Sequence, residues 1–108
     1  MLIQFVEDGQ LRQFNSEDAT LLADLSRGAG AGQAKWIEVY QLPDGRFVEV
    51  HRFDRPGKEE PEAETVFDAS FIDLGKVIRV LAAASEEQRS EAGNALLARH
   101  GPADVAAG

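Results

Sequence analysis

The chain has 108 residues, of which 44% are hydrophobic and 28% charged, which is the balance of one ordinary folded domain. It contains no cysteine, which excludes disulfides, thiolate zinc sites and cysteine nucleophiles. Nineteen acidic and eleven basic residues give a net charge of -8, and the basic residues are scattered singly, so direct binding of nucleic acid is not expected.

The first 25 residues predict a hairpin followed by a helix. Two short β-prone segments, residues 2–6 and 11–14, flank an Asp8-Gly9 pair, and Asp-Gly readily supplies the positive φ angles of a tight turn. Residues 15–18 then offer capping side chains and first-turn acids before an apolar stripe that runs from Ala19 to Leu25. This order of capping residues and apolar stripe predicts a helix start.

The glycine-rich stretch SRGAGAGQAKW, residues 26–36, superficially resembles a phosphate-binding loop. A Walker A loop needs a lysine followed by Ser or Thr at a set spacing from its glycines, and Lys35 does not meet that requirement. A dinucleotide fingerprint lies between a strand and the helix it opens, whereas here the expected order is helix first and strand second. We therefore interpret the stretch as a helix stop and a flexible connector.

Residues 35–53, KWIEVYQLPDGRFVEVHRF, predict a second β-hairpin around Pro43-Asp44-Gly45. A two-residue loop at Asp44-Gly45 would give one aliphatic face and one aromatic and charged face, and for that reason we prefer it. The aliphatic face would hold Ile37, Val39, Val48 and Val50, and the other would pair Trp36, Glu38, Tyr40 and Leu42 with Phe53, His51, Glu49 and Phe47. A type I turn with a glycine bulge also suits this sequence, and it would shift the pairing by one residue and mix both faces.

Residues 54–64 are rich in Pro, Gly, Lys and Glu and predict a solvated acidic loop. Between residues 54 and 68 there are six acids and two bases, a net charge of -4 and half of the total. Residues 65–67 are candidates for a short edge strand.

Two C-terminal helices are expected. Ser70 to Asp73 resembles a capping box before apolar residues at helical spacing, and Ser85 to Gln88 is a second one, at which either a new helix or a bend is expected. The second helix should run to His100 and stop at Gly101-Pro102.

Together these elements predict an α+β fold of ββαββα-like order, with hairpins in one small antiparallel sheet and helices packed on one face. We expect a single domain over residues 1–102, with the acidic loop at 54–64 and a flexible tail at 103–108.

Candidate catalytic and metal-binding groups are few. His51 and His100 are far apart in sequence, and two histidines without a close His-x-x-x-His pair are weak evidence for zinc. In the preferred hairpin register His51 would pair across the strands with Glu38, and His100 would cap a helix. Ser16, Ser70 and Ser85 all occupy expected helix N-caps. We therefore predict no catalytic residue, no metal, no cofactor and no enzyme activity.

The candidate partner-binding residues lie on the second hairpin and in the acidic loop. They are Trp36, Glu38, Tyr40, Glu49, Phe53, Glu59, Glu60, Glu62 and Glu64. Trp and Tyr are favoured interface anchors, and the acidic loop favours a partner with a basic surface. Burial of the aromatic face beneath a helix is the alternative interpretation.

The expected function is that of a small, acidic, non-catalytic protein-binding module. One concrete version is a phage or mobile-element inhibitor of the anti-CRISPR type, which would block the basic nucleic-acid-binding surface of a partner complex. The alternatives are a structural or accessory subunit that homodimerises through the hairpin face and a minor carboxylate-dependent enzyme. The N-terminus has no signal-peptide pattern and no segment is long and apolar enough to span a membrane, so no membrane partner and a cytoplasmic location are expected.

Overall fold

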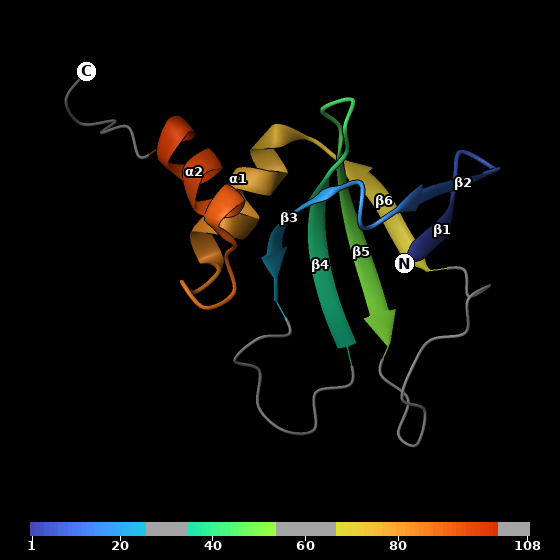
Figure 1. The fold of residues 1–108 in the computed structure, drawn as a ribbon, viewed down its shortest axis with the longest axis horizontal. Helices are drawn as coiled ribbons and strands as arrows, with labels where there is room; N and C mark the ends of the chain where they lie inside the picture. The colour runs from blue at the N-terminus through green and yellow to red at the C-terminus, as the bar shows by residue number, and fades with distance from the viewer. Residues whose placement is uncertain (26–34, 54–66, 102–108) are drawn as a thin grey trace.

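The computed structural model describes residues 1–25, 35–53 and 67–101, and shows an α+β fold (Figure 1). Its elements in chain order are β1 (Leu2–Glu7), β2 (Gln10–Asn15), β3 (Thr20–Asp24), β4 (Lys35–Gln41), β5 (Phe47–Phe53), β6 (Asp68–Ile72), α1 (Leu74–Ala83) and α2 (Glu91–His100). The expected α+β class is confirmed. The expected ββαββα order is wrong, because the described strands all precede the two helices.

The first hairpin is confirmed. β1 pairs antiparallel with β2 from Leu2 opposite Asn15 to Glu7 opposite Gln10, which leaves a two-residue turn. Asp8 has φ 54° and Gly9 has φ 75°, as a tight turn of this kind requires. These two strands form a sheet of their own, so the expectation of one sheet is also wrong.

The helix expected after residue 19 is instead strand β3. The amide of Glu17 donates to Oδ1 of Asn15 at 3.0 Å, a local turn and not a helix cap. The strand lies at one edge of the four-stranded sheet β3-β4-β5-β6, and its register on β4 shifts between Leu21 and Ala23. Both of its faces are covered by other elements, so its apolar run is continuous. Periodicity alone does not separate such a short run from a helix.

The second hairpin is confirmed, but the preferred register is wrong. The amide of Gly45 donates to the carbonyl of Leu42 at 2.9 Å, and the amide of Leu42 donates to the carbonyl of Arg46 at 2.8 Å. Gly45 has φ 94°. These bonds describe a type I turn followed by a glycine bulge, which was the alternative considered. The pairing is therefore shifted by one residue, with Glu38 opposite Val50.

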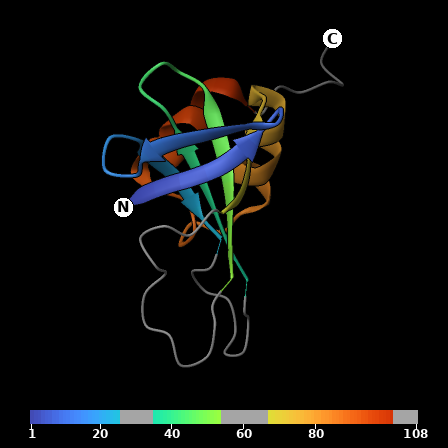
Figure 2. The same ribbon diagram turned by 90° about the vertical axis from the view of Figure 1, so that its right-hand side faces the viewer.

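Two buried clusters lie on the two faces of the four-stranded sheet. The first joins the inner face of β1–β2 to the sheet through Ile3, Phe5, Tyr40, Leu42, Val48, Val50, Phe67 and Ala69. The second joins the helices to the sheet through Leu22, Ala23, Val39, Val77, Leu81 and Leu96. The sheet therefore lies between the β1–β2 hairpin and the helix pair (Figures 1 and 2).

Both helices begin later than their capping boxes predict. Ser70 lies in β6, and α1 is capped by Asp73, whose Oδ1 accepts from the amide of Lys76 at 2.8 Å. The Ser85 amide does bond to Oε1 of Gln88 at 3.0 Å, but this is a turn, and α2 is capped by Ser90. The predicted end of α2 is confirmed at His100, with Gly101 as its C-cap.

Several expectations fall outside the described residues: the connector at 26–34, the acidic loop at 54–64, residues 65–66 of the candidate edge strand 65–67 and the tail at 103–108. Phe67, the last residue of that candidate strand, precedes β6 and is not part of a strand. The domain limits therefore stay a prediction. Neither of the described helices is long and apolar enough to cross a membrane.

Candidate functional site

The predicted partner-binding face of the second hairpin is divided by the observed register. Glu38 and Tyr40 share the sheet face that β1–β2 covers, since each lies opposite a valine of the first cluster. Glu49 lies opposite Val39, which belongs to the cluster on the helix side. A one-residue shift sends alternate side chains to opposite faces, so the predicted residues do not form one surface.

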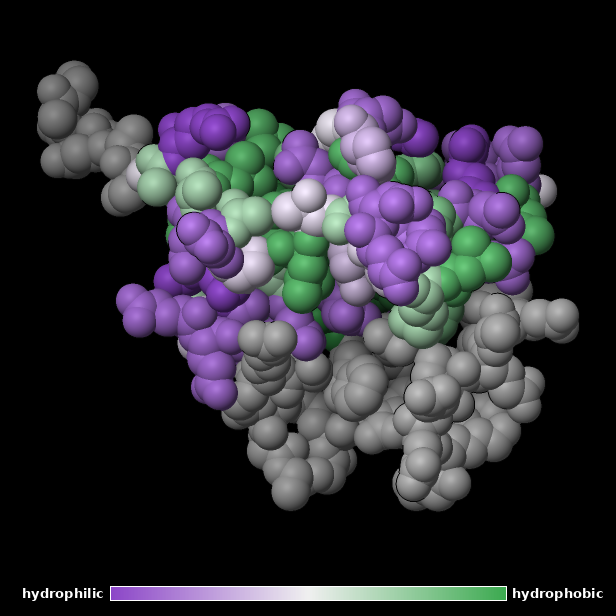
Figure 3. Space-filling view, viewed as in Figure 1, coloured by the Kyte–Doolittle hydropathy of each residue, from purple (hydrophilic) through white to green (hydrophobic). Residues whose placement is uncertain are grey.

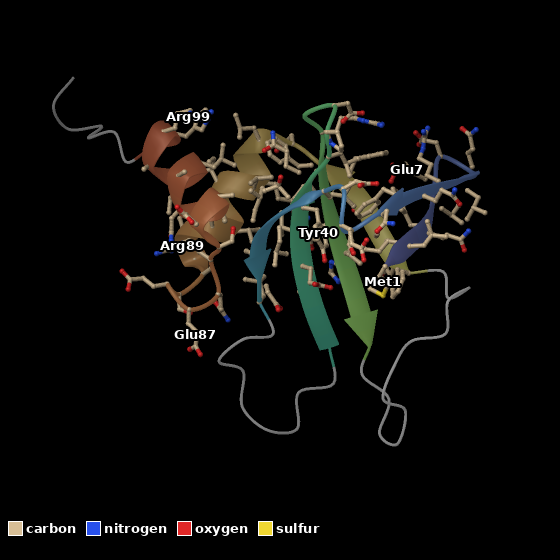
Figure 4. All side chains as sticks on the ribbon, viewed as in Figure 1. Met1, Glu7, Tyr40, Glu87, Arg89 and Arg99 are labelled. Atoms are coloured by element: carbon tan, nitrogen blue, oxygen red, sulfur yellow. The ribbon has the colours of Figure 1, made fainter. Side chains whose placement is uncertain are left out.

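Tyr40 and Glu38 are both buried. Tyr40 is 5% exposed and Glu38 is 9% exposed, and the Tyr40 hydroxyl donates to Oε2 of Glu38 at 2.9 Å. The Tyr40 ring meets the ring of Phe14 edge to face, with centroids 5.7 Å apart. Figure 4 shows Tyr40 at the centre of the molecule. In the isolated chain the β1–β2 hairpin, and not a helix, covers this pair.

The remaining predicted residues are not described. The backbones of Trp36 and Phe53 belong to β4 and β5, but their side chains lie outside the described part of the structure. Glu59, Glu60, Glu62 and Glu64 lie outside the described residues altogether. A role in binding a partner stays a prediction for these six residues, as it does for Glu38, Tyr40 and Glu49.

A charged cluster joins β5 to α1 on the helix side of the sheet. Nε2 of His51 lies 2.5 Å from Oε1 of Glu49, and Nζ of Lys76 lies 3.3 Å from Oε2 of the same carboxylate. The Glu49 side chain is only 10% exposed. Burial raises the pKa of Glu49, but the contacts with His51 and Lys76 outweigh it, so the pKa lies below the ordinary 4.5.

The expected partner of His51 was Glu38, and the structure places His51 opposite Ile37 instead. Its carboxylate neighbour is two residues along its own strand, where the period-2 alternation of a strand puts both side chains on one face. Nδ1 of His51 is buried and has no hydrogen-bond partner. Within the fold Lys76 pairs with the Glu49 carboxylate, and a role of Glu49 in binding a partner stays a prediction.

A hollow of about 230 Å³ lies between the β1–β2 hairpin and the outer end of the four-stranded sheet. Its lining is Phe5, Gln10, Leu11, Arg12, Gln13, Phe14, Leu42, Arg46 and Phe71. The guanidinium carbon of Arg46 lies 4.5 Å from the centroid of the Phe71 ring, and that of Arg12 lies 5.7 Å from it. None of the three residues of the charged cluster lines this hollow.

Sequence analysis missed this hollow. Arg12 lies on β2 and Arg46 lies in the turn before β5, 34 positions further along the chain, so no local motif contains both. Only the packing of the β1–β2 hairpin against β6 brings both arginines next to the Phe71 ring. Among the described residues, no group of three or more His, Cys, Asp or Glu side chains is arranged to hold a metal ion.

No protein-family model, curated protein or solved structure matches this chain. Any functional argument therefore depends on the charges, burial and contacts of its own residues.

Proposed function

We propose that this chain is a small, non-catalytic binding module that occupies the basic surface of a partner protein. The observation that carries the proposal is the imbalance of exposed charge over the described residues. Nine exposed acidic residues stand against four exposed basic ones. The acids are Asp8, Glu17, Asp18, Asp44, Asp68, Asp73, Glu86, Glu87 and Glu91, and the bases are Arg46, Lys76, Arg79 and Arg99.

Contacts within the fold engage several of the basic side chains. Lys76 neutralises the buried Glu49, and Arg46 is paired with Asp44, with Nε 2.7 Å from Oδ2. Arg89 is turned inward, and its Nη1 donates to the carbonyls of Leu81 and Ala84 at 2.9 and 2.7 Å. Lys76, Arg46 and Arg89 are thus engaged within the fold, while many carboxylates remain available to a partner.

Some of these acids lie where a partner can reach them. Glu86 and Glu87 are exposed in the segment that joins α1 to α2, and Figure 4 shows Glu87 pointing away from the body of the molecule. Hydrophilic residues gather over the same region at the lower left of Figure 3. Clustered charge of one sign raises the rate of encounter with a surface of the opposite sign and opposes binding to phosphate backbones.

The proposed mechanism is steric and electrostatic. A carboxylate-rich surface that occupies a partner's Lys and Arg side chains competes with any nucleic acid for the same side chains. An inhibitor of the anti-CRISPR type carried by a phage or mobile element would act in this way. In this proposal the loop residues Glu59, Glu60, Glu62 and Glu64 add to the acidic surface.

The test is capture of the partner by charge variants. The tagged chain is used to capture proteins from the source cell, and the partner is then purified and its affinity for nucleic acid measured with and without the chain. We expect competition that weakens as salt is raised. Glu86→Lys with Glu87→Lys, or the four loop glutamates changed to Lys, should weaken capture by about tenfold or more.

The control removes charge of the other sign. Arg79→Gln with Arg99→Gln makes the chain more acidic and should leave capture unchanged or stronger. Capture that is unaffected by both acidic variants would contradict the proposal, as would a partner that keeps its full affinity for nucleic acid in the complex.

A second candidate, a homodimerising subunit, is favoured by one observation. On the outer face of β1–β2, Val6 and Leu11 are directly opposite each other and each is 56% exposed, and Leu2 on the same face is 40% exposed. Figure 3 shows hydrophobic residues reaching the surface at this end of the molecule, on the right. This is a different hairpin from the one expected to dimerise. Size-exclusion chromatography with light scattering measures the mass of the chain in solution. A dimer that Val6→Ser with Leu11→Ser converts to a monomer would support this candidate. A chain that is monomeric both with and without these substitutions would exclude it.

A further inference from the structure

The hollow between β2 and β6 contains a concentration of positive charge in an otherwise acidic chain. Arg12 and Arg46 both line it, and both lie within 6 Å of one aromatic ring, that of Phe71. Two guanidinium groups over a shared ring repel each other, and each cation–π contact offsets only part of that cost. A negative charge between them would favour the arrangement.

One of the two arginines already has such a charge. Both Nε of Arg46 and its backbone amide bond to the carboxylate of Asp44, at 2.7 and 3.0 Å. Those bonds hold the pKa of Asp44 below its ordinary value, so this carboxylate is ionised at neutral pH. Arg12, Arg46 and Asp44 together therefore leave one net positive charge at the hollow.

Arg12 supplies that charge, and one of its hydrogen-bond donors has no acceptor. Its Nε is buried and has no hydrogen-bond partner. A buried guanidinium N–H without an acceptor is unfavourable, and a carboxylate is the acceptor whose geometry best matches the guanidinium fork. An occupant with one carboxylate would cancel the net charge, and carboxylate geometry matches that of the guanidinium group.

The rest of the lining and its size limit the ligand further. Phe5, Phe14 and Leu42 supply apolar walls, which suit a short aliphatic or aromatic body. The hollow, of about 230 Å³, is below the range of about 300 to 1,000 Å³ of sites that enclose drug-sized ligands and cofactors, so it is too small to enclose a nucleotide. A phosphate carries more negative charge than the single net positive charge here can balance.

We propose that this hollow is a binding site for a single carboxylate carried on a small apolar group, with Arg12 as its principal partner. Two sources present that chemistry: a free monocarboxylic acid, and the C-terminal residue of a peptide that ends in an apolar side chain. This site is separate from the acidic surface proposed above, and it binds or fails to bind without any partner protein.

The experiment is a titration of the ¹⁵N-labelled full chain followed by amide chemical shifts. The probes are 4-methylpentanoate, the peptide acetyl-Gly-Leu with a free carboxylate, the same peptide as its C-terminal amide, and inorganic phosphate. We expect one of the two carboxylates to shift the amides of residues 10–14, 46 and 71 with a Kd of about 1 mM or tighter, as suits a contact of this size. The C-terminal amide should bind about tenfold more weakly or not at all.

Variants assign the binding to Arg12. Arg12→Gln should abolish it, and Arg12→Lys, which keeps the charge but loses Nε and the planar fork, should weaken it by about tenfold. Arg99→Gln on the exposed end of α2 is the matched control and should bind as the unchanged chain does. Amide shifts outside the hollow show whether each variant keeps its fold. If Arg12→Gln does not fold, the proposal is tested by the unchanged chain alone, from the difference in its affinity for the peptide acid and for the peptide amide.

Whichever carboxylate binds more tightly identifies the source, free acid or chain terminus. The proposal is overturned if the amide binds as well as the acid, if phosphate binds more tightly than either carboxylate, if a folded Arg12→Gln variant binds normally, or if none of the probes shifts these amides at 20-fold above about 1 mM.

Discussion

Gly93 in α2 lies directly against the carbonyl oxygen of Leu22 in β3, so that a Cβ at position 93 would be 2.1 Å from that oxygen. This close approach is one of several contacts that cover the edge of β3. The amide of Asp24 donates to the carbonyl of Gln88 at 2.8 Å, and the amide of Ser90 donates to the carbonyl of Leu22 at 3.0 Å. The chain between the helices thus covers a strand edge that would otherwise be free to pair with another protein.

Gly93→Ala should therefore destabilise the fold, although alanine is the better helix former. The added methyl group forces α2 away from β3, and overpacking of this kind costs about 1 to 3 kcal/mol. Gly75→Ala in α1 is the control, because its Cβ would meet only Oδ1 of Asp73 at 3.4 Å. It should be neutral or stabilise by up to about 1 kcal/mol. Urea unfolding of the two variants measures both effects, and equal stabilities would refute the close contact.

Ser90 has two roles at the same edge, so its loss should be costly. Its Oγ accepts from the amide of Gly93 at 3.0 Å as the N-cap of α2 and donates to the carbonyl of Leu21 at 2.5 Å. Ser90→Ala removes both bonds and should lower the free energy of unfolding by about 1 to 3 kcal/mol. Ser85→Ala is the control, since that serine is exposed and its bond to Gln88 uses the backbone amide. Thermal unfolding that does not separate the two variants would argue against the cap.

The Tyr40 hydroxyl should be worth more to stability than an exposed one, because Glu38 is buried beside it. Tyr40→Phe keeps the ring contact with Phe14 but removes the donor from a buried carboxylate, at a cost of about 1 to 3 kcal/mol. The double-mutant cycle with Glu38→Gln isolates the pair. A coupling energy near zero would show that the two side chains do not depend on each other.

The charged cluster on the other face should make stability depend on pH. Because the pKa of Glu49 is lower in the folded state than the ordinary 4.5, its contribution is present above that value and is lost as the pH falls through the folded pKa. Denaturant unfolding between pH 7 and 3 should show that the free energy of unfolding decreases toward the acidic end of this range. In Glu49→Gln this part of the fall should disappear, and an unchanged profile would contradict the assignment.

Local chemistry predicted much of the fold but not how its parts combine. The Asp8-Gly9 turn, the hairpin at Pro43-Asp44-Gly45 and the end of α2 at Gly101 all depend on residues close in sequence, and all are confirmed. The expectations that failed needed distant partners. Leu21 and Leu22 form a strand because β4 pairs beside them and the helices cover them, and no local signal carries that information.

The candidate site shows the same division. The sequence determines the acidity of the chain, the absence of cysteine and the residue types able to bind a partner. The tertiary structure decided the hairpin register through the bulge at Gly45, and with it the burial of Tyr40 and the position of Glu49 beside Lys76. It also brought Arg12 and Arg46 to the ring of Phe71. The physical reason is that turn type, capping and charge depend on neighbouring residues. Register and packing depend instead on the free energies of contacts between segments that are far apart in the chain.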